Sequence, residues 1–82
     1  QQSYNTSVTL ESIPLAQAAR VVGFRGLDEI DKIQLNGLGL RPGVLVTKIL
    51  RTPLGDPIEC LVGSQLLAIE SRLLPHIRVE AL

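Results

Sequence analysis

Apolar residues occur along the chain in short runs that glycine and proline separate. Runs of this length, rich in Val, Ile and Leu, are typical of β-strands and are too short for most helices. We therefore expect strands over residues 18–24, 44–50, 57–63 and 64–70. The stretch "TPLGDP" at residues 52–57 predicts a stiff loop, because neither of its prolines can donate to a strand ladder.

Period-2 alternation marks both ends of the patterned region. In "IRVEAL", residues 77–82, an alternating pattern predicts a half-buried closing strand with Ile77, Val79 and Ala81 facing inward. A shorter alternation at Val8 and Leu10 precedes a proline, which excludes a regular central strand there.

Residues 28–38 form the one segment with a helical pattern. Asp28 can cap the first turn, and Glu29 and Asp31 lie where the helix dipole favours negative charge. The helix is expected to bury an apolar face made of Ile30, Ile33, Leu35 and Leu38.

A second, single helical turn is expected in residues 71–77. Ser71 would cap it weakly and Pro75 would end it.

Glycine and proline mark the turns. Pro42 and Gly43 occupy the two centre positions of a predicted type II turn, and Gly39 suits the left-handed residue after a helix. The turn residues, interpreted as backbone requirements and not as contacts, are Gly39, Pro42, Gly43, Pro53, Gly55, Pro57 and Gly63.

Together these elements predict a mainly β fold of five to six strands with one or two short helices, arranged as a small, partly open barrel. The 82 residues suffice for one domain, which we place at residues 8–82 after a flexible N-terminal tail of residues 1–7. Tyr4 and Phe24 are the only aromatic residues, so Leu, Ile and Val must build the core.

Charge and hydropathy exclude several classes of function. Eight Lys and Arg balance eight Asp and Glu without any block of one sign, which argues against non-specific nucleic-acid binding and a polybasic membrane anchor. No apolar run approaches the roughly 20 residues of a membrane span, so direct membrane insertion is not expected. The single cysteine cannot form an intrachain disulfide, which fits a reducing compartment.

The residues that enzymes use are scarce. One histidine, His76, and one cysteine, Cys60, cannot build a zinc or iron site within a monomer, so only a metal held between subunits would revive an enzymatic interpretation. We expect Cys60 in the core and His76 in a surface or structural role. The chain is therefore interpreted as a non-enzyme without a cofactor or metal.

Recognition of a partner remains, and the stiff loop is its first candidate. Leu54 could fold back to cap the barrel, which we favour, or stand out as an anchor for a partner. Asp56 is expected to accept hydrogen bonds from nearby backbone amides as an Asx turn.

The stretch "LNGLGLRPGVLVTKILRTPLGDPIECLVGSQLLAI", beginning at Leu35, resembles the core of the FeoA family, the small ferrous iron transport protein A. The family's Leu-Gly-Leu, Pro-Gly, Pro-Leu-Gly-Asp-Pro and Leu-Ala-Leu-like motifs match in order, and Ile77 and Val79 match its terminal Ile-x-Val. The resemblance extends from about Val8 to the end.

This resemblance implies an SH3-like β-barrel and an accessory protein of bacterial ferrous iron uptake. The implied partner is the cytosolic, GTP-binding part of the FeoB permease, which would place the protein in the cytoplasm and recruit it to the inner face of the membrane. Candidate contact residues are Leu38, Leu40, Leu54 and Asp56. The alternative is a regulatory or metal-sensing domain similar to the C-terminal domain of iron-dependent repressors, and a homo-oligomer is a further option because a small barrel has unpaired edges.

The chain departs from the family pattern at several positions. Ala16 and Gln17 stand where a glycine is usual, and Leu74 where a small residue is usual. Gln34 and Glu70 align with arginines, which would change contacts with an acidic partner.

Overall fold

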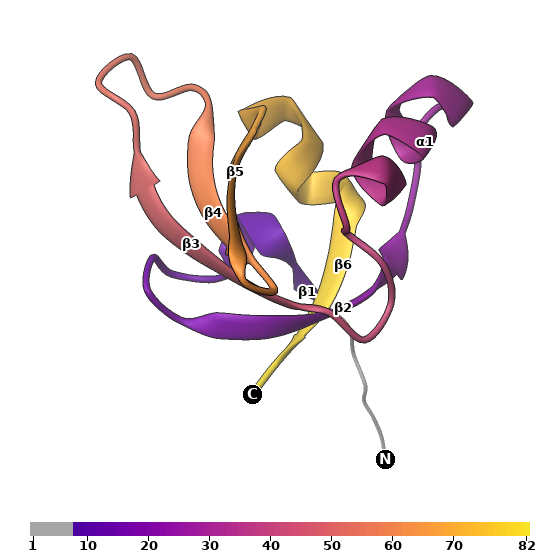
Figure 1. Cartoon of the computed structure of the whole chain (residues 1–82), viewed down its shortest axis with the longest axis horizontal. Helices are drawn as coiled ribbons and strands as arrows, with labels where there is room; N and C mark the ends of the chain where they lie inside the picture. The colour runs from indigo at the N-terminus through magenta and orange to yellow at the C-terminus, as the bar shows by residue number, and fades with distance from the viewer. Residues whose placement is uncertain (1–7) are drawn as a thin grey trace.

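The computed structural model describes residues 8–82, so the predicted N-terminal tail, residues 1–7, lies outside the described residues. Within that range the backbone forms six strands, one α-helix and two short 3-10 helices (Figure 1). The elements are β1 (Val8–Thr9), η1 (Leu10–Ser12), β2 (Ala18–Phe24), α1 (Glu29–Gly37), β3 (Leu45–Arg51), β4 (Ile58–Val62), β5 (Gln65–Ile69), η2 (Ser71–His76) and β6 (Ile77–Ala81).

All six strands belong to one antiparallel sheet, in the order β1-β6-β2-β3-β4-β5. The sheet curls around a core without closing, so β1 and β5 are its edges (Figure 1). Register shifts in β2, between Val21 and Gly23, and in β3, between Lys48 and Leu50, interrupt the ladders and increase the local bend. The mainly β architecture predicted from the sequence is confirmed.

The connections follow the turn chemistry of the sequence. Gly43 has a φ of +96°, and the N–H of Val44 donates to the carbonyl of Arg41 at 3.1 Å, as in a type II turn. Gly39 has a φ of +99° directly after the helix, where an L side chain would be strained. Gly63 and Ser64 join β4 to β5 in a two-residue hairpin.

The core is built almost entirely of Leu, Ile and Val, as the low aromatic content requires. It draws on the inward faces of five strands and on both 3-10 helices. Its fully or nearly fully buried members include Leu10, Val21, Leu35, Leu40, Val46, Ile58, Cys60, Ile69, Ile77 and Val79. Burying each such aliphatic side chain stabilises the fold by roughly 1.5–3 kcal/mol before the loss of conformational entropy is subtracted.

Helix α1 begins as expected, but the predicted apolar face is wrong. The Asp28 carboxylate accepts a hydrogen bond from the Asp31 N–H at 2.9 Å. Leu35 is buried and Leu38 is half-buried, whereas Ile30 is 77% and Ile33 is 68% exposed. The apolar contacts of the helix with the barrel come from its last turn, and Ile30 and Ile33 project into solvent.

Three further expectations near the C-terminus are corrected. Ser71 is the first residue of η2 and not its cap, since Glu70 occupies that position, and Pro75 lies inside η2 and does not end it. In β6, Ile77 and Val79 are buried as predicted, but Ala81 is exposed because the strand runs out beyond the core.

Candidate interaction surface

Three segments lie along one side of the molecule. Helix η2 lies between the loop at residues 52–57 and helix α1, which stand at opposite ends of that side, and the C-terminus lies on the other side (Figure 1). The loop carries the candidate contact residues Leu54 and Asp56, and the candidate Leu38 directly follows α1, so this side is the candidate interaction surface.

Leu54 stands at the tip of the loop with 95% of its surface exposed. The loop beneath it is held by its own hydrogen bonds: the N–H of Gly55 donates to the Thr52 carbonyl at 2.8 Å, and the Thr52 hydroxyl donates to the Pro57 carbonyl at 2.9 Å. The expectation that Leu54 caps the barrel is therefore wrong, because the loop turns its leucine away from the core.

Asp56 does not form the expected local Asx turn. Its Oδ1 accepts from the backbone N–H of Ser71 at 2.7 Å and from the Ser71 hydroxyl at 3.0 Å. The same hydroxyl lies 3.1 Å from the Gly55 carbonyl. The carboxylate thus satisfies a free N–H at the start of η2 and ties the loop to that helix.

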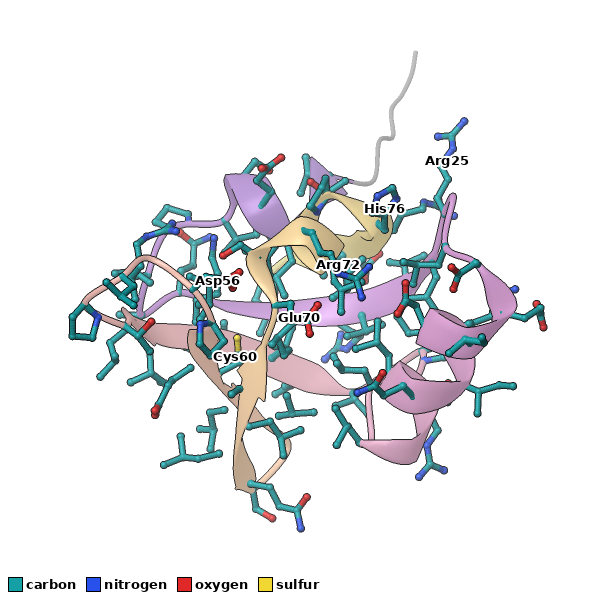
Figure 2. All side chains as sticks on the ribbon, turned by 90° about the horizontal axis from the view of Figure 1, so that it is seen from above. Arg25, Asp56, Cys60, Glu70, Arg72 and His76 are labelled. Carbon is teal, nitrogen blue, oxygen red and sulfur yellow. The ribbon has the colours of Figure 1, made fainter. Side chains whose placement is uncertain are left out.

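Arg72 links η2 to α1 through its guanidinium. Two of its nitrogens donate to both carboxylate oxygens of Asp31 in α1, at 2.9 and 3.0 Å, and Nε donates to Glu70 at 2.6 Å. Figure 2 shows Glu70 and Arg72 side by side, with α1 across from them. The hydrogen bonds from Arg72 hold the pKa of Asp31 below its ordinary value. This bidentate pair fastens α1 to η2.

A small groove runs between α1 and the end of β5. Its walls are formed by residues of α1, β5 and η2, namely Gln34, Leu35, Leu38, Ala68, Ile69, Glu70, Arg72 and Leu73. The cavity volume is about 60 Å³, which is room for a few waters or the end of one aliphatic side chain. A second, open hollow beside it is lined by Asp56, Pro57, Ala68 and Glu70.

The four predicted contact residues differ in their exposure. Leu54 and Asp56 lie on the exposed loop, and Leu38 lines the groove. Leu40 is 0% exposed, so its prediction as a contact residue is wrong. The chain turns inward after Gly39 and places Leu40 in the core, where the Leu40 N–H donates to the Leu35 carbonyl at 3.0 Å.

Cys60 and His76 have structural surroundings. Cys60 is fully buried, and burial raises the pKa of its thiol to about 11, so the residue cannot reach a metal shared between subunits. His76 Nδ1 lies 2.8 Å from the Arg25 carbonyl and ties η2 to the end of β2. Within residues 8–82, no three His, Cys, Asp or Glu side chains cluster in a way that could hold a metal ion.

None of the helices described in residues 8–82 is long and apolar enough to cross a membrane.

Sequence reasoning missed the partners Asp31, Ser71 and Arg72. Asp31 was interpreted only through the helix dipole and Ser71 as a local cap, because both roles depend on near neighbours in the chain. The Arg72–Asp31 pair spans 41 positions, and no local pattern indicates it. Gln34 and Glu70, the two residues that align with arginines of the family pattern, both line the groove.

The chain is similar to a known protein family. The family model described as the FeoA domain matches residues 8–81. No curated protein matches the chain.

Solved structures give the same family. The FeoA protein of Chlorobium tepidum is 27% identical with a TM-score of 0.82, and the match covers 92% of this chain and 70% of that one. FeoA of Stenotrophomonas maltophilia, solved with zinc and described as a prokaryotic SH3 domain protein, is 26% identical with a TM-score of 0.74 over 89% of each chain. IdeR of T. acidophilum is 19% identical with a TM-score of 0.82, covering 96% of this chain and 36% of that one, and so shares the fold.

Proposed function

The chain belongs to the FeoA domain family, and from this premise we propose that it is a non-enzymatic interaction module of ferrous iron uptake. It acts in the cytoplasm, where it docks on the cytosolic, GTP-binding part of a FeoB-like permease at the inner face of the membrane. Through that contact it modulates the permease's assembly or its nucleotide cycle.

Two lines of observation support this proposal. The Stenotrophomonas maltophilia relative is described as a candidate activating factor of bacterial ferrous iron transport. Cys60 is buried with a raised pKa and His76 faces a backbone carbonyl, so neither residue is placed as an exposed nucleophile or base. What the molecule offers is a shaped surface.

The exposed Leu54 is the observation that carries the proposal. An apolar side chain that is 95% exposed gains free energy only when another surface covers it. The loop is stiffened by Pro53 and Pro57 and by its own hydrogen bonds, so little conformational entropy is lost when a partner binds it. Rigid, exposed apolar anchors of this kind are typical of interface hot spots.

Calorimetric titration with the permease's cytosolic domain tests the proposal. We expect Leu54→Ser to weaken binding by about tenfold or more, the usual effect of removing a buried apolar anchor. Leu82→Ser is the matched control, because Leu82 is also exposed, at 65%, but lies on the opposite side of the molecule (Figure 1). Absence of wild-type binding at high micromolar concentration would contradict the proposed function.

The alternative of a repressor-type regulatory domain rests on fold alone. The match to IdeR lies below 20% identity and covers about a third of that protein. The structure adds no observation that favours this alternative, so the permease partner is the function we propose.

A further inference from the structure

Strand β5 leaves backbone groups without partners at the edge of the sheet. The Gly63 N–H donates to Leu45 in β3, so in β4 the backbone groups of alternate residues point to β3 or to β5. Within the hairpin, Val62 pairs with Gln65 and Cys60 with Leu67, and these pairs exchange the hydrogen bonds. The N–H and C=O groups of Leu66 and Ala68 therefore point away from β4, and no described residue pairs with them.

This edge lacks the usual protection against pairing. Natural edge strands carry charges, prolines or bulges, or are very short. The other edge, β1, has two residues, whereas β5 has five and none of them is charged. Leu66, at 64% exposed, and Ala68 both face outward beside the open groups. Strand β5 can therefore pair with a further strand at this edge.

The surroundings fix what can bind there. Helix α1 lies across the groove from the end of β5, with Leu35 and Leu38 on its wall (Figures 1 and 2). Because α1 occupies the space beside the edge, one extended strand fits more readily than the sheet of a second folded domain. In such a strand, a residue beside Ile69 would point to the inner side, toward Leu35 and Leu38.

The outer side of the same site is acidic. Glu59 on β4 pairs across from Ala68, and Asp56 and Glu70 line the open hollow over Ala68. Arg72 is the cation beside them, and it already binds Asp31 and Glu70. Glu59 makes no ion pair within the described residues. A residue paired with Ala68 therefore meets carboxylates across a small side chain, which favours Lys or Arg.

We propose that the open edge of β5 binds one extended segment of a partner protein by strand addition. The segment alternates aliphatic and basic residues: the aliphatic side chain beside Ile69 enters the groove next to Leu35 and Leu38, and a basic side chain crosses Ala68 toward Glu59 and Glu70. This deepens the proposed function, on which the identity of the partner rests, by assigning the recognised structure and its chemistry.

A synthetic pentapeptide, acetyl-Val-Lys-Val-Lys-Val-amide, is the probe. Added to the isotopically labelled chain, it should shift the amide NMR signals of Leu66, Ala68 and Glu70 together with those of α1. The same peptide N-methylated on alternate residues, or with Glu in place of Lys, should bind about tenfold more weakly, because it loses backbone hydrogen bonds or meets like charge. Equal binding of all three peptides, or shifts confined to other surfaces, would overturn the proposal.

Variants of Ala68 test the same edge with the whole partner. Ala68→Pro removes the outward N–H and blocks the edge while sparing the ladder to β4, and Ala68→Thr keeps the N–H as the matched control. We expect the proline variant alone to bind the permease's cytosolic domain about tenfold more weakly. Equal binding of both variants overturns the edge proposal and leaves the proposed function standing. If the wild-type chain does not bind the permease domain, the proposed function is wrong, and the peptide titration alone tests the β5 edge. The peptide titration is also the test of the edge if the proline variant does not fold.

Discussion

At the scale of single residues, Ala16 adopts a backbone conformation that its side chain disfavours. Its φ is +70°, the one positive φ among non-glycine residues in the described range. Its N–H donates to the Lys48 carbonyl at 2.7 Å, so the conformation is held by a link from the η1–β2 connection to β3. Glycine, the residue usual here in the family pattern, adopts this conformation without strain.

Replacing Ala16 by Gly should therefore stabilise the protein. Relief of the left-handed strain, about 1–2 kcal/mol, outweighs the extra entropy of an unfolded glycine, so we expect a gain of roughly 0.5–1 kcal/mol in the free energy of unfolding. Urea denaturation with an unchanged m-value measures it. Ala18→Gly, in regular strand β2, is the control and should destabilise the protein. A loss of stability on Ala16→Gly would contradict the argument.

Asp56 and Leu54 show what sequence could tell about single residues. The sequence identified the loop and its two candidate side chains, because proline and glycine act on the backbone locally. It gave Asp56 a local partner, yet the partner is Ser71, 15 positions away. Whether Leu54 points inward depends on how the loop leaves the barrel, which only the assembled strands determine.

At the scale of elements, boundaries were predictable where local chemistry sets them. The predicted strand 18–24 and the strands flanking the Pro-Gly turn and the stiff loop agree with β2, β3 and β4 to within a residue or so. Helix α1 also agrees, because Asp28 and Gly39 act within one turn. Its burial was mispredicted, since an apolar face at Ile30 and Ile33 requires the helix to lie along the core and α1 packs by its last turn instead.

Helix α1 consequently depends on the Arg72–Asp31 pair. Without apolar burial in its first turns, the bidentate hydrogen bonds at 2.9 and 3.0 Å are the main tie of that end to η2. The lowered pKa of Asp31 means that the folded state holds this carboxylate ionised more firmly than the unfolded chain does. The stabilisation is therefore fully present above the ordinary pKa of Asp and is lost as the pH falls through the lowered folded value.

Arg72→Ala should loosen α1 selectively. We expect amide hydrogen exchange near neutral pH to speed up in α1 while β2 and β3 stay protected, and the acid-induced loss of α1 signals to become shallower because Asp31 has lost the partner that lowers its pKa. Lys32→Ala is the matched control, since its ion pair with Glu29 is an exposed contact within α1, and it should change little. Uniform faster exchange over the whole sheet would contradict a local role for Arg72.

At the scale of the whole molecule, the order of motifs in the sequence was enough to predict the fold, but the interaction surface could be identified only from the structure. Each strand, turn and cap in the sequence favours the same antiparallel sheet, which is why the architecture could be read from the chain. The interaction surface joins a loop, an edge strand and a helix that are far apart in sequence. Its charge balance in particular comes from Arg72 binding Asp31 and Glu70 together, a contact that exists only after folding.

The oligomeric state follows from the same arrangement. An uncharged edge such as β5 would ordinarily pair with a second copy, but α1 lies across the groove from the end of β5, where it would crowd the sheet of that copy. We therefore expect the wild-type chain to sediment as a monomer at about 100 μM. Arg72→Ala, by loosening α1, should expose the edge and produce concentration-dependent association.

Adding Ala68→Pro to Arg72→Ala tests whether that association uses β5. The proline removes the outward N–H and fills the edge, so the double variant should sediment as a monomer again. If the double variant associates as strongly as Arg72→Ala alone, the contact lies elsewhere, for instance on the exposed Ile30 and Ile33 of α1. A wild-type chain that already forms a stable dimer would show instead that α1 does not guard the edge, and that the strand β5 accepts is its own copy.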